Sequence, residues 1–499
     1  MSAITKQNYR GVYHFSPQAK WMNDPNGMVF FEGEYHLFFQ HHPGGMTMGS
    51  MHWGHAVSKD LVSWEELPIA LFPDELGMIF SGSAVVDWNN TTGFFADKPG
   101  LVAIFTHHLD MPEGQPPVQR QSLAYSHDNG RTWTKYEGNP VLEDDAFIDF
   151  RDPKVFWNRE TDKWVMIVAC GQTVCLYHSP DLIHWTFASE FGKGIGSHDG
   201  VWECPDLFPL HVDGDASNTK WVMLVSIGAD PAFVEGSRTQ YFTGGFDGKV
   251  FTPDEDSRNI RWLDYGRDNY AGVSWSDVPE EDGRRLFIGW MSNWMYAPQT
   301  PAEEFRGAMT LPRELYLESR EGKILLIQKP AKELEMVRIP VLSFENATVQ
   351  EINASLASLQ LDAYEIAVKF IRGMSAGIKV RVGDGEETLT GIDGKTGELY
   401  VDRLASGQKD FHEWFPGRHT AVLQAPGETN DLCIFVDRTS VEVFGNGGQA
   451  VITDLIFPKS ESAGLAVFAE NEEIPFLSLD IYKLVRPAAN GDNNQQSED

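Results

Sequence analysis

The sequence predicts an all-β protein with two domains. Short runs rich in β-branched and aromatic residues, such as LVAIFTHH, KWVMIVAC and YEIAVKFI, recur along the chain between Gly, Asn, Asp and Pro, and helical periodicity is nearly absent. The 499 residues exceed the size at which a single hydrophobic core stops growing, so two cores are expected. A short pattern that suits propeller blades also recurs in the first part of the chain.

Composition narrows the class of partner. Hydrophobic residues make up 42% and charged residues 22% of the chain, which are ordinary values for a globular protein. With 40 Lys and Arg against 72 Asp and Glu, the formal net charge is −32. Because so acidic a surface repels nucleic-acid phosphates and anionic lipid headgroups, neither a nucleic acid nor a membrane is expected as a partner.

The two domains are expected to meet near 330–341. Of the 15 tryptophans, 14 lie before residue 300, and so do 13 of the 15 histidines. The segment KPAKELEMVRIP has spaced apolar residues among charges and a proline near each end, as a short helical connector does. We therefore assign 1–330 to the first domain, 331–341 to a linker, 342–486 to the second domain and 487–499 to a polar disordered tail.

The first domain has a weak internal repeat in which an Asp-bearing turn precedes a tryptophan. It occurs as SKDLVSW, SHDNGRTW and SPDLIHW at 58–64, 126–133 and 179–185. Recurrence roughly every 50 to 70 residues in an all-β segment predicts propeller blades that pack radially on one another. The alternative is that this pattern simply makes a good hairpin turn.

The second domain has runs in which apolar and polar residues alternate, among them AGIKVRVG and DLCIFVDRTSVEVFG. Such alternation is typical of strands buried on one face, so the second domain is predicted to be a β-sandwich. Trp414 and Phe415 form its one evident aromatic platform. The role expected of this domain is to bury one side of the first and to contribute to a dimer interface.

Three short segments of the first domain combine an acidic residue, a proline and a following apolar run. They are WMNDPNG, FRDP and WECPD, at 21–27, 150–153 and 202–206. Because proline cannot donate a hydrogen bond to a β-ladder, it favours the start of a strand or an edge. We expect Asp24, Asp152 and Glu203 to lie at strand entrances and to converge at one mouth of the propeller channel, where a small ligand fits.

Convergent carboxylates beside Trp, Asn and Arg suit glycoside cleavage. One carboxylic acid protonates the leaving oxygen, while a second carboxylate attacks carbon or activates water. We expect Arg151 to hold the neighbouring Asp152 ionised, and the apolar neighbours of Glu203 to favour its protonated form. The alternative is that these acids form turns or surface ion pairs, and spacing does not rank Asp149 and Asp206 below them.

The same three segments resemble the signature motifs of glycoside hydrolase family 32, which contains invertases, levanases and inulinases. Further matches follow in family order, namely FFQHHP, MHWGHAVSKDLVSW, FSGSAV, GRDNYAG, IGWMSNW and VDRTSVEVFGNGG. The resemblance implies a five-bladed β-propeller followed by a C-terminal β-sandwich. It also implies retaining exo-hydrolysis of terminal β-fructofuranosyl residues from levan, inulin, fructo-oligosaccharides and sucrose, without a metal or an organic cofactor.

The resemblance also implies a role for each site residue. By motif, Asp24 would be the nucleophile, Glu203 the general acid and base, and Asp152 the stabiliser of the transition state. The residues implied to line the fructose pocket are Asn23, Gln40, Trp53, Phe80, Ser81, Arg151, Tyr270 and Trp294. The expected partners are neutral fructose-containing saccharides, since aromatic rings stack on sugar faces while amide and charged groups take the hydroxyls.

Histidines and cysteines invite two other interpretations. No metal is expected, because four clustered histidines fall on a loop and a strand without an adjacent carboxylate set; they are His41, His42, His52 and His55. Four cysteines are too few for a disulfide framework and are expected to be reduced thiols; they are Cys170, Cys175, Cys204 and Cys433.

Several alternatives stay open. A sucrose-preferring invertase, or a fructosyltransferase in which a sugar hydroxyl resolves the intermediate, would use the same residues, and an inactive carbohydrate-binding protein could share the scaffold. The first twenty residues hold no apolar stretch of signal-peptide length, so the chain as given is expected in the cytoplasm, or outside the cell if a signal peptide was removed. We expect a monomer or a homodimer.

Overall fold

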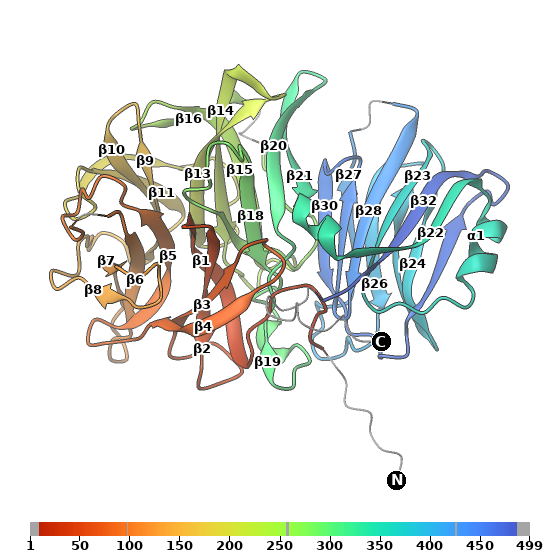
Figure 1. Cartoon of the computed structure of the whole chain (residues 1–499), viewed down its shortest axis with the longest axis horizontal. Coiled ribbons are helices and arrows are strands. Elements are labelled where there is room, and N and C mark those ends of the chain that lie inside the picture. Colours follow the sequence, from red (N-terminus) through yellow and green to blue (C-terminus); the bar gives the residue numbers. More distant parts are fainter. Residues whose placement is uncertain (1–8, 97, 256–258, 425–426, 487–499) are drawn as a thin grey trace, which may run out of the picture.

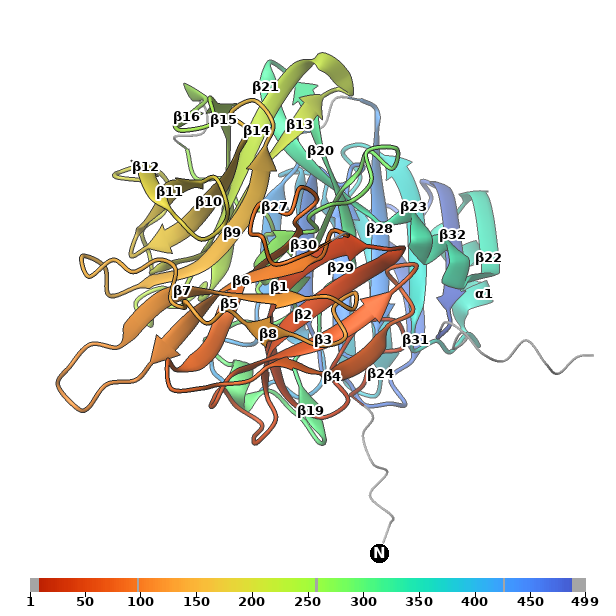
Figure 2. The same cartoon turned by 60° about the vertical axis from the view of Figure 1, so that its left-hand side comes forward.

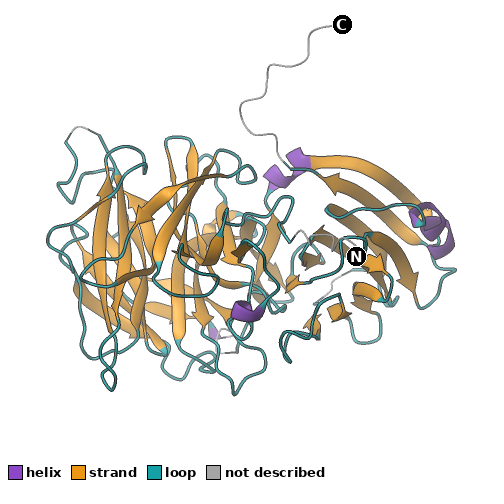
Figure 3. Cartoon of the chain, turned by 90° about the horizontal axis from the view of Figure 1, so that it is seen from below, coloured by secondary structure: helices purple, strands orange, loops and turns teal. Residues whose placement is uncertain are grey.

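The computed structural model describes residues 9–96, 98–255, 259–424 and 427–486. Strands dominate it (Figure 3), and they form two lobes side by side, with the earlier part of the chain in one lobe and the C-terminal third in the other (Figure 1). The first lobe is a β-propeller and the second a β-sandwich, as the sequence predicts. The predicted tail, 487–499, lies outside the described residues.

The described strands of the first lobe form five blades, and the last two blades join into one sheet. Figure 2 shows the first blades, in red and orange, at the front. Blade 1 contains β1 (Lys20–Phe31), β2 (Glu34–His42), β3 (His52–Ser58) and β4 (Glu65–Leu71), with β19 (Phe305–Arg306) paired along β1. Blade 2 contains β5 (Met78–Val86), β6 (Leu101–Leu109), β7 (Val118–Ser126) and β8 (Thr134–Lys135). Blade 3 contains β9 (Phe150–Asn158), β10 (Lys163–Cys170), β11 (Thr173–Ser179) and β12 (Thr186–Phe191). Blade 4 contains β13 (Trp202–Val212), β14 (Asp215–Ile227), β15 (Arg238–Phe246) and β16 (Phe251–Pro253). Blade 5 contains β17 (Tyr270–Ser274), β18 (Arg285–Trp290), β20 (Arg313–Arg320) and β21 (Lys323–Pro330), and the 3₁₀ helix η2 (Ala297–Gln299) lies between β18 and β19.

The first strand of each blade lies innermost. β1 contacts β5, β5 contacts β9, β9 contacts β13, β13 contacts β17, and β17 contacts β1, so the five strands close a ring around a central channel. Apolar side chains fill the space between neighbouring blades. Between blades 3 and 4, for example, the buried cluster includes Ile167, Leu176, Met223 and Phe242. This packing fixes the inner strands, and with them the side chains that face the channel.

The repeated turn joins the third and fourth strands of blades 1 to 3. In each copy the side chain of the turn's aspartate accepts hydrogen bonds from backbone N–H groups that follow it: two at Asp60, one at Asp128 and two at Asp181. The indole N–H of the tryptophan then donates to a carbonyl three residues earlier at 2.8–3.0 Å, in the pairs Trp64 to Leu61, Trp133 to Gly130 and Trp185 to Leu182. The repeat is therefore a blade signature as well as a stable turn.

A short connector leads to the second lobe. The 3₁₀ helix η3 (Lys332–Val337) follows β21 and passes directly into β22, so the predicted linker, 331–341, contains this helix and the start of a strand. In the described part of the second lobe, one sheet has the order β22 (Arg338–Ala347), β32 (Phe476–Leu484), β23 (Tyr364–Ile371), β28 (Thr429–Asp437), β29 (Ser440–Gly445) and β30 (Ala450–Leu455). The facing sheet has the order β27 (Arg418–Val422), β26 (Glu398–Ala405), β25 (Glu386–Asp393), β24 (Ala376–Gly383) and β31 (Gly464–Ala469).

One α-helix, α1 (Val349–Leu356), lies in the described part of the second lobe. It begins with a capping box, in which the side chains of Thr348 and Glu351 each accept a hydrogen bond from the other residue's backbone N–H. Its buried face joins the apolar core between the two sheets. None of the described helices is long and apolar enough to span a membrane.

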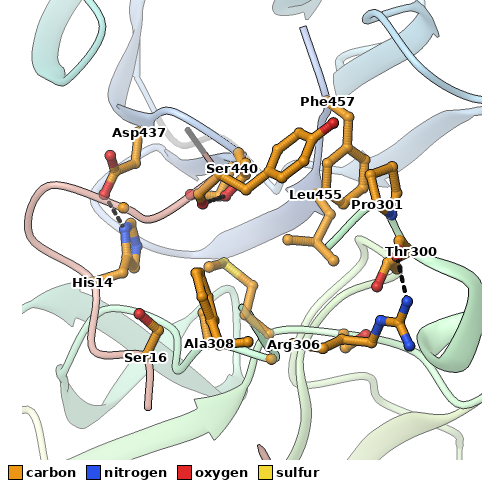
Figure 4. Close-up of a pocket in the computed structure, with 17 residues that line it drawn as sticks. His14, Ser16, Thr300, Pro301, Arg306, Ala308, Asp437, Ser440, Leu455 and Phe457 are labelled. Atoms are coloured by element: carbon orange, nitrogen blue, oxygen red, sulfur yellow. Dashed lines mark hydrogen bonds and ion pairs between the residues drawn. The ribbon is translucent and has the colours of Figure 1, made fainter. Parts of the chain in front are cut away.

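Buried charges join the two lobes. His14 lies between two carboxylates of the sandwich. Its Nδ1 lies 2.8 Å from Asp437 (Figure 4), and its Nε2 lies 2.9 Å from Glu442. Burial disfavours the charged imidazole, but these two partners outweigh it and raise the pKa of His14 to about 9. The small cavity beside them, of about 40 Å³, is lined by residues of both lobes and by none of the predicted catalytic acids.

The cysteines correct one prediction. Cys170 and Cys175 form a disulfide across the β10–β11 hairpin, with their Cα atoms 6.1 Å apart, whereas all four cysteines were expected to be reduced. The sequence does not reveal this pair, because only the tight hairpin brings the two Cα atoms within disulfide reach. Cys204 and Cys433 are free.

Candidate active site

All five inner strands have an irregular register near the same end of the channel. The ladder shifts at Met22/Pro25 in β1, at Ile79/Gly82 in β5, after Arg151 in β9, at Glu203/Asp206 in β13 and at Tyr270/Val273 in β17. A bulge breaks the alternation of side chains and re-aims them, which is why bulges are common beside active sites. Asp152 and Cys204 also have left-handed backbone, with φ of 63° and 45°, a strained state that clusters at functional sites.

The three predicted acids lie together. Asp24, Asp152 and Glu203 all line one cavity of about 590 Å³ at this end of the channel. Asp152 and Glu203 lie close to the starts of β9 and β13, as expected. Asp24 does not: it is the fifth residue of β1, because the bulge rather than a strand entrance turns it into the channel.

Cys204 lies between two of these acids. Its backbone N–H donates to Asp152 Oδ2 at 3.0 Å, and its Sγ lies 3.5 Å from the same oxygen and 3.7 Å from Asp24 Oδ2. Burial, followed by the charges of the three carboxylates, raises the pKa of this thiol well above its ordinary value. Cys204 is therefore a neutral thiol that packs between the acids and donates to them.

Asp24 is oriented by neutral donors. Asn23 Nδ2 donates to Oδ1 at 3.0 Å, and Ser81 Oγ donates to Oδ2 at 2.9 Å. Burial and then the charge of Glu203 raise the pKa of Asp24 to about 6, against the lowering effect of these hydrogen bonds. The carboxylate is thus held in one orientation and is ionised at neutral pH.

The pKa of Asp152 differs from the expectation that the neighbouring Arg151 holds this carboxyl group ionised. Burial raises the pKa of Asp152 to about 7, and the positive charge of Arg151 opposes this shift without reversing it. The Arg151 guanidinium turns instead to Glu203, donating to Oε1 from Nε at 3.1 Å and from Nη2 at 2.9 Å. Its Nη1 donates to Asp149. Asp149, the acid that the sequence did not rank below Asp152, is therefore an ion-pair partner of Arg151.

Glu203 therefore has polar partners rather than the apolar setting predicted for it. Besides Arg151, the hydroxyl of Tyr270 donates to Glu203 Oε2. The neighbouring Trp202 points the other way and is fully buried in the core between blades 3 and 4. A Cβ atom added at Gly228 would lie 3.3 Å from Glu203 Oε2, so the glycine leaves free space on that side of the carboxyl group.

The remaining predicted pocket residues divide into two groups. Besides the three acids, those that line the cavity are Asn23, Gln40, Phe80, Ser81, Arg151 and Trp294. Trp53 and Tyr270 do not line it, because both are buried in the wall behind it, at 0% and 1% exposure. Trp53 donates its indole N–H to the carbonyl of Phe80 at 2.9 Å, so both residues support groups that face the cavity.

The cavity also has walls that sequence reasoning missed. The additional lining residues are Met48, Val201, Gly228, Ala229, Pro231, Met295, His412 and Trp414. Most are small or apolar loop residues, which carry no chemical signature. His412 and Trp414 belong to the second lobe, and the only signal for them was the isolated aromatic pair at 414–415.

The channel is closed beneath the acids. Asp206 is fully buried and accepts hydrogen bonds from the N–H and Oγ of Ser274, both at 2.7 Å, while Lys154 Nζ lies 3.7 Å from it. Lys154 and Asp206 line a second cavity of about 700 Å³ at the C-terminal ends of the inner strands. Among the described residues, the two cavities share no lining residue, so Asp206 belongs to the floor and not to the acid cluster.

The clustered histidines have other partners. His36 and His55 hydrogen-bond each other at 3.0 Å, while three others bond backbone carbonyls, in the pairs His41 with Trp21, His42 with Thr47 and His52 with Ser50. Within the described ranges, no group of three or more His, Cys, Asp or Glu side chains is arranged to hold a metal ion.

Family models match both lobes. Residues 14–330 match the N-terminal domain of glycosyl hydrolases family 32, and residues 333–483 match the C-terminal region of the same family. The chain belongs to glycosyl hydrolase family 32. The resemblance seen in the sequence is thereby confirmed, and this family 32 chain is a glycoside hydrolase of the fructofuranosidase kind.

Proteins similar to this family 32 chain match it over nearly its whole length. A levanase of Bacillus subtilis (strain 168) is 51% identical over 491 residues, which cover 97% of this chain and 71% of the relative. An extracellular exo-inulinase of Aspergillus niger is 38% identical over 516 residues, covering 96% and 95%. The crystal structure of an exo-inulinase from Aspergillus awamori superposes with a TM-score of 0.86 at 36% identity, covering 96% of this chain and 99% of the other.

Proposed function

We propose that this family 32 hydrolase removes terminal β-D-fructofuranosyl residues, one at a time, from levan, inulin, shorter fructo-oligosaccharides and sucrose. One observation carries the proposal: Asp24, Asp152 and Glu203 face a single cavity whose far end is closed. A closed pocket admits a chain end and excludes the middle of a polymer. The similarity to a levanase and to exo-inulinases supports fructans as the substrate class.

The first chemical step forms a bond to the protein. An Asp24 oxygen attacks the anomeric carbon, the glycosidic carbon–oxygen bond breaks, and Glu203 gives its proton to the leaving oxygen. Asn23 and Ser81 hold the attacking carboxylate in place. Arg151 and Tyr270 hold the carboxyl group of Glu203.

The second step returns the protein to its starting state. Glu203, now a carboxylate, takes a proton from water, the water oxygen attacks the anomeric carbon, and the bond to Asp24 breaks. Two substitutions at the same carbon retain its configuration. Asp152 binds fructose hydroxyls, and in its ionised form it stabilises the cationic transition state.

Neutral side chains complete recognition of the terminal fructose. Asn23 and Gln40 present amides to its hydroxyl groups, while Phe80 and Trp294 present ring faces. Gln40 Nε2 is buried and has no hydrogen-bond partner within the described structure, so it is free to donate to a sugar oxygen. These side chains thus suit a neutral sugar as the ligand.

The test is fructose release from levan, inulin, 1-kestose and sucrose by wild type, Asp24→Ala and Glu203→Gln. The two variants should lose several orders of magnitude in rate and keep their fold. Glu472→Gln, which changes an exposed carboxyl group away from the cavity, is the matched control and should keep the wild-type rate.

The products discriminate between the alternatives. Mass spectrometry of Glu203→Gln incubated with β-D-fructofuranosyl fluoride should find a fructosyl group bound to Asp24, because fluoride leaves without a proton from Glu203 while the second step still needs Glu203 as a base. A folded Asp24→Ala variant with near-normal turnover would overturn the assignment. Activity confined to sucrose would indicate an invertase, and growing oligosaccharides at high sucrose a fructosyltransferase. An inactive wild type would indicate a binding protein.

The assembly and the location are also proposals. We propose a monomer or a homodimer acting on neutral saccharides, in the cytoplasm for the chain as given and outside the cell if a signal peptide was removed. Light scattering coupled to size-exclusion chromatography measures the assembly. Fractionation of the native host measures the location.

A further inference from the structure

The wall of the catalytic cavity comes from both lobes. His412 and Trp414 lie in the loop between β26 and β27 of the sandwich, yet they line the same cavity as the three acids. Both side chains are partly exposed, and their rings meet edge to face with centroids 5.5 Å apart. The backbone N–H of Trp414 donates to His412 Nδ1 at 3.2 Å, which fixes the two residues relative to each other.

This loop is held to the propeller by a buried charge network. Arg403 Nη1 donates to Asp268 at 2.6 Å, and Arg403 Nη2 donates to the hydroxyl of Tyr296 at 3.0 Å. Arg403 Nε donates to the carbonyl of Phe415 at 2.7 Å, and its guanidinium lies 4.0 Å from the centre of that ring. The network therefore clamps the residue directly after Trp414 to the propeller.

The propeller side of this clamp also belongs to the cavity. Trp294 and Met295 line the cavity, and Tyr296 enters the interface directly after them. The rings of Tyr296 and His412 lie 5.9 Å apart. One propeller segment and one sandwich loop thus form a continuous wall whose position depends on the docking of the lobes.

We propose that Trp414 and His412 form a subsite for the leaving-group sugar, the unit that is released when the terminal fructose is cut off. This rests on the proposed function. The cavity, about 590 Å³, lies in the size range of pockets for ligands larger than a single small ring, so a terminal fructose at the acids leaves room for the next unit. The Trp414 ring offers an apolar face for that sugar, and His412 offers a hydrogen-bonding nitrogen to its hydroxyls.

The chemistry selects a neutral sugar as the ligand. Besides the acids and the amide groups, the lining of the cavity contains the apolar residues Met48, Pro231 and Met295. A sugar ring presents one apolar face and a rim of hydroxyls, which suits this combination. The second lobe then takes part in substrate recognition, in addition to covering the propeller.

The test compares substrates that differ only in the leaving group. Methyl β-D-fructofuranoside carries no leaving sugar, whereas 1-kestose, nystose and inulin do. For Trp414→Ala, kcat/KM should fall about tenfold on the three saccharides, mainly through KM, and by less than about twofold on the methyl glycoside. Trp414→Phe should recover most of the loss, and inhibition by free fructose should be unchanged.

A control variant separates this subsite from general effects. Trp88→Ala removes a tryptophan that is 58% exposed and lines the cavity at the other end of the channel, so it should match wild type on all substrates. Equal losses by Trp414→Ala on the methyl glycoside and the saccharides, or no loss on either, would overturn the subsite. Failure of the proposed function itself is distinct, because the wild type would then release no fructose from any substrate.

Discussion

Replacing Asp24 by asparagine should abolish turnover and stabilise the protein at the same time. Burial and the nearby charge of Glu203 raise the pKa of Asp24 from 3.8 to about 6. As the pH rises through this interval, the unfolded chain loses its proton before the folded chain does, so stability is lost between about pH 4 and pH 6. Asparagine keeps the shape of the side chain and does not ionise.

The magnitude follows from the size of the shift. About two pKa units correspond to roughly 3 kcal/mol in the free energy of unfolding, and partial exposure of the carboxyl group reduces this to about 2 kcal/mol. For a lobe of this size we expect the melting temperature of Asp24→Asn to exceed that of wild type by roughly 4 °C at pH 8.

Calorimetry of wild type, Asp24→Asn and Glu472→Gln at pH 8 and pH 4 measures this effect. The advantage of Asp24→Asn should be present at pH 8 and should shrink toward zero at pH 4, where the carboxyl group is protonated in the folded protein. Glu472→Gln should show no such difference. Equal melting of Asp24→Asn and wild type at pH 8, or a gain that does not depend on pH, would refute the reasoning.

Three further outcomes follow from the same contacts. The value of kcat/KM should fall below about pH 6, because Asp24 must be ionised to attack; a profile that stays flat down to pH 4 would contradict this. Tyr270→Phe should lower kcat about tenfold at unchanged melting temperature, since a hydrogen bond to Glu203 is lost, and steady-state kinetics checks it. Arg403→Met should destabilise the protein by about 3–5 kcal/mol, because Asp268 is left buried without its partner. Adding Asp268→Asn should restore part of that stability, as measured by denaturant titration. If the losses of the two single variants simply add in the double variant, the two residues do not stabilise each other.

Much of the fold and the acid cluster could be predicted from the sequence. Both depend on local patterns: runs of strand residues, the Ser-x-Asp turn, and motifs in which an acid lies close to a proline. Local patterns identify a strand and the residue on it. They do not predict how far a bulge rotates a side chain. The guanidinium of Arg151, which lies at the bulge in β9, pairs with Glu203 and not with the neighbouring Asp152.

The residues that the sequence misplaced depend on long-range packing. Trp53 and Tyr270 lie in motifs that match the family, but both side chains are buried behind the cavity wall. They therefore support the residues that line the cavity and do not line it themselves. Trp414 is remote in sequence from every acid and enters the cavity only because the two lobes dock. The Cys170–Cys175 pair is a local exception, since it depends on the geometry of one hairpin.

The closed floor of the channel also dictates the order in which molecules come and go. With Lys154 and Asp206 closing the channel below the acids, substrate, water and both products use the same mouth. The fructose unit occupies the blind end and the rest of the polymer lies above it, so the shortened chain has to depart before water enters and before fructose escapes. The polymer is therefore released in every cycle. We expect the enzyme to trim many chains in parallel, by repeated encounters, and not to travel along one chain to its end.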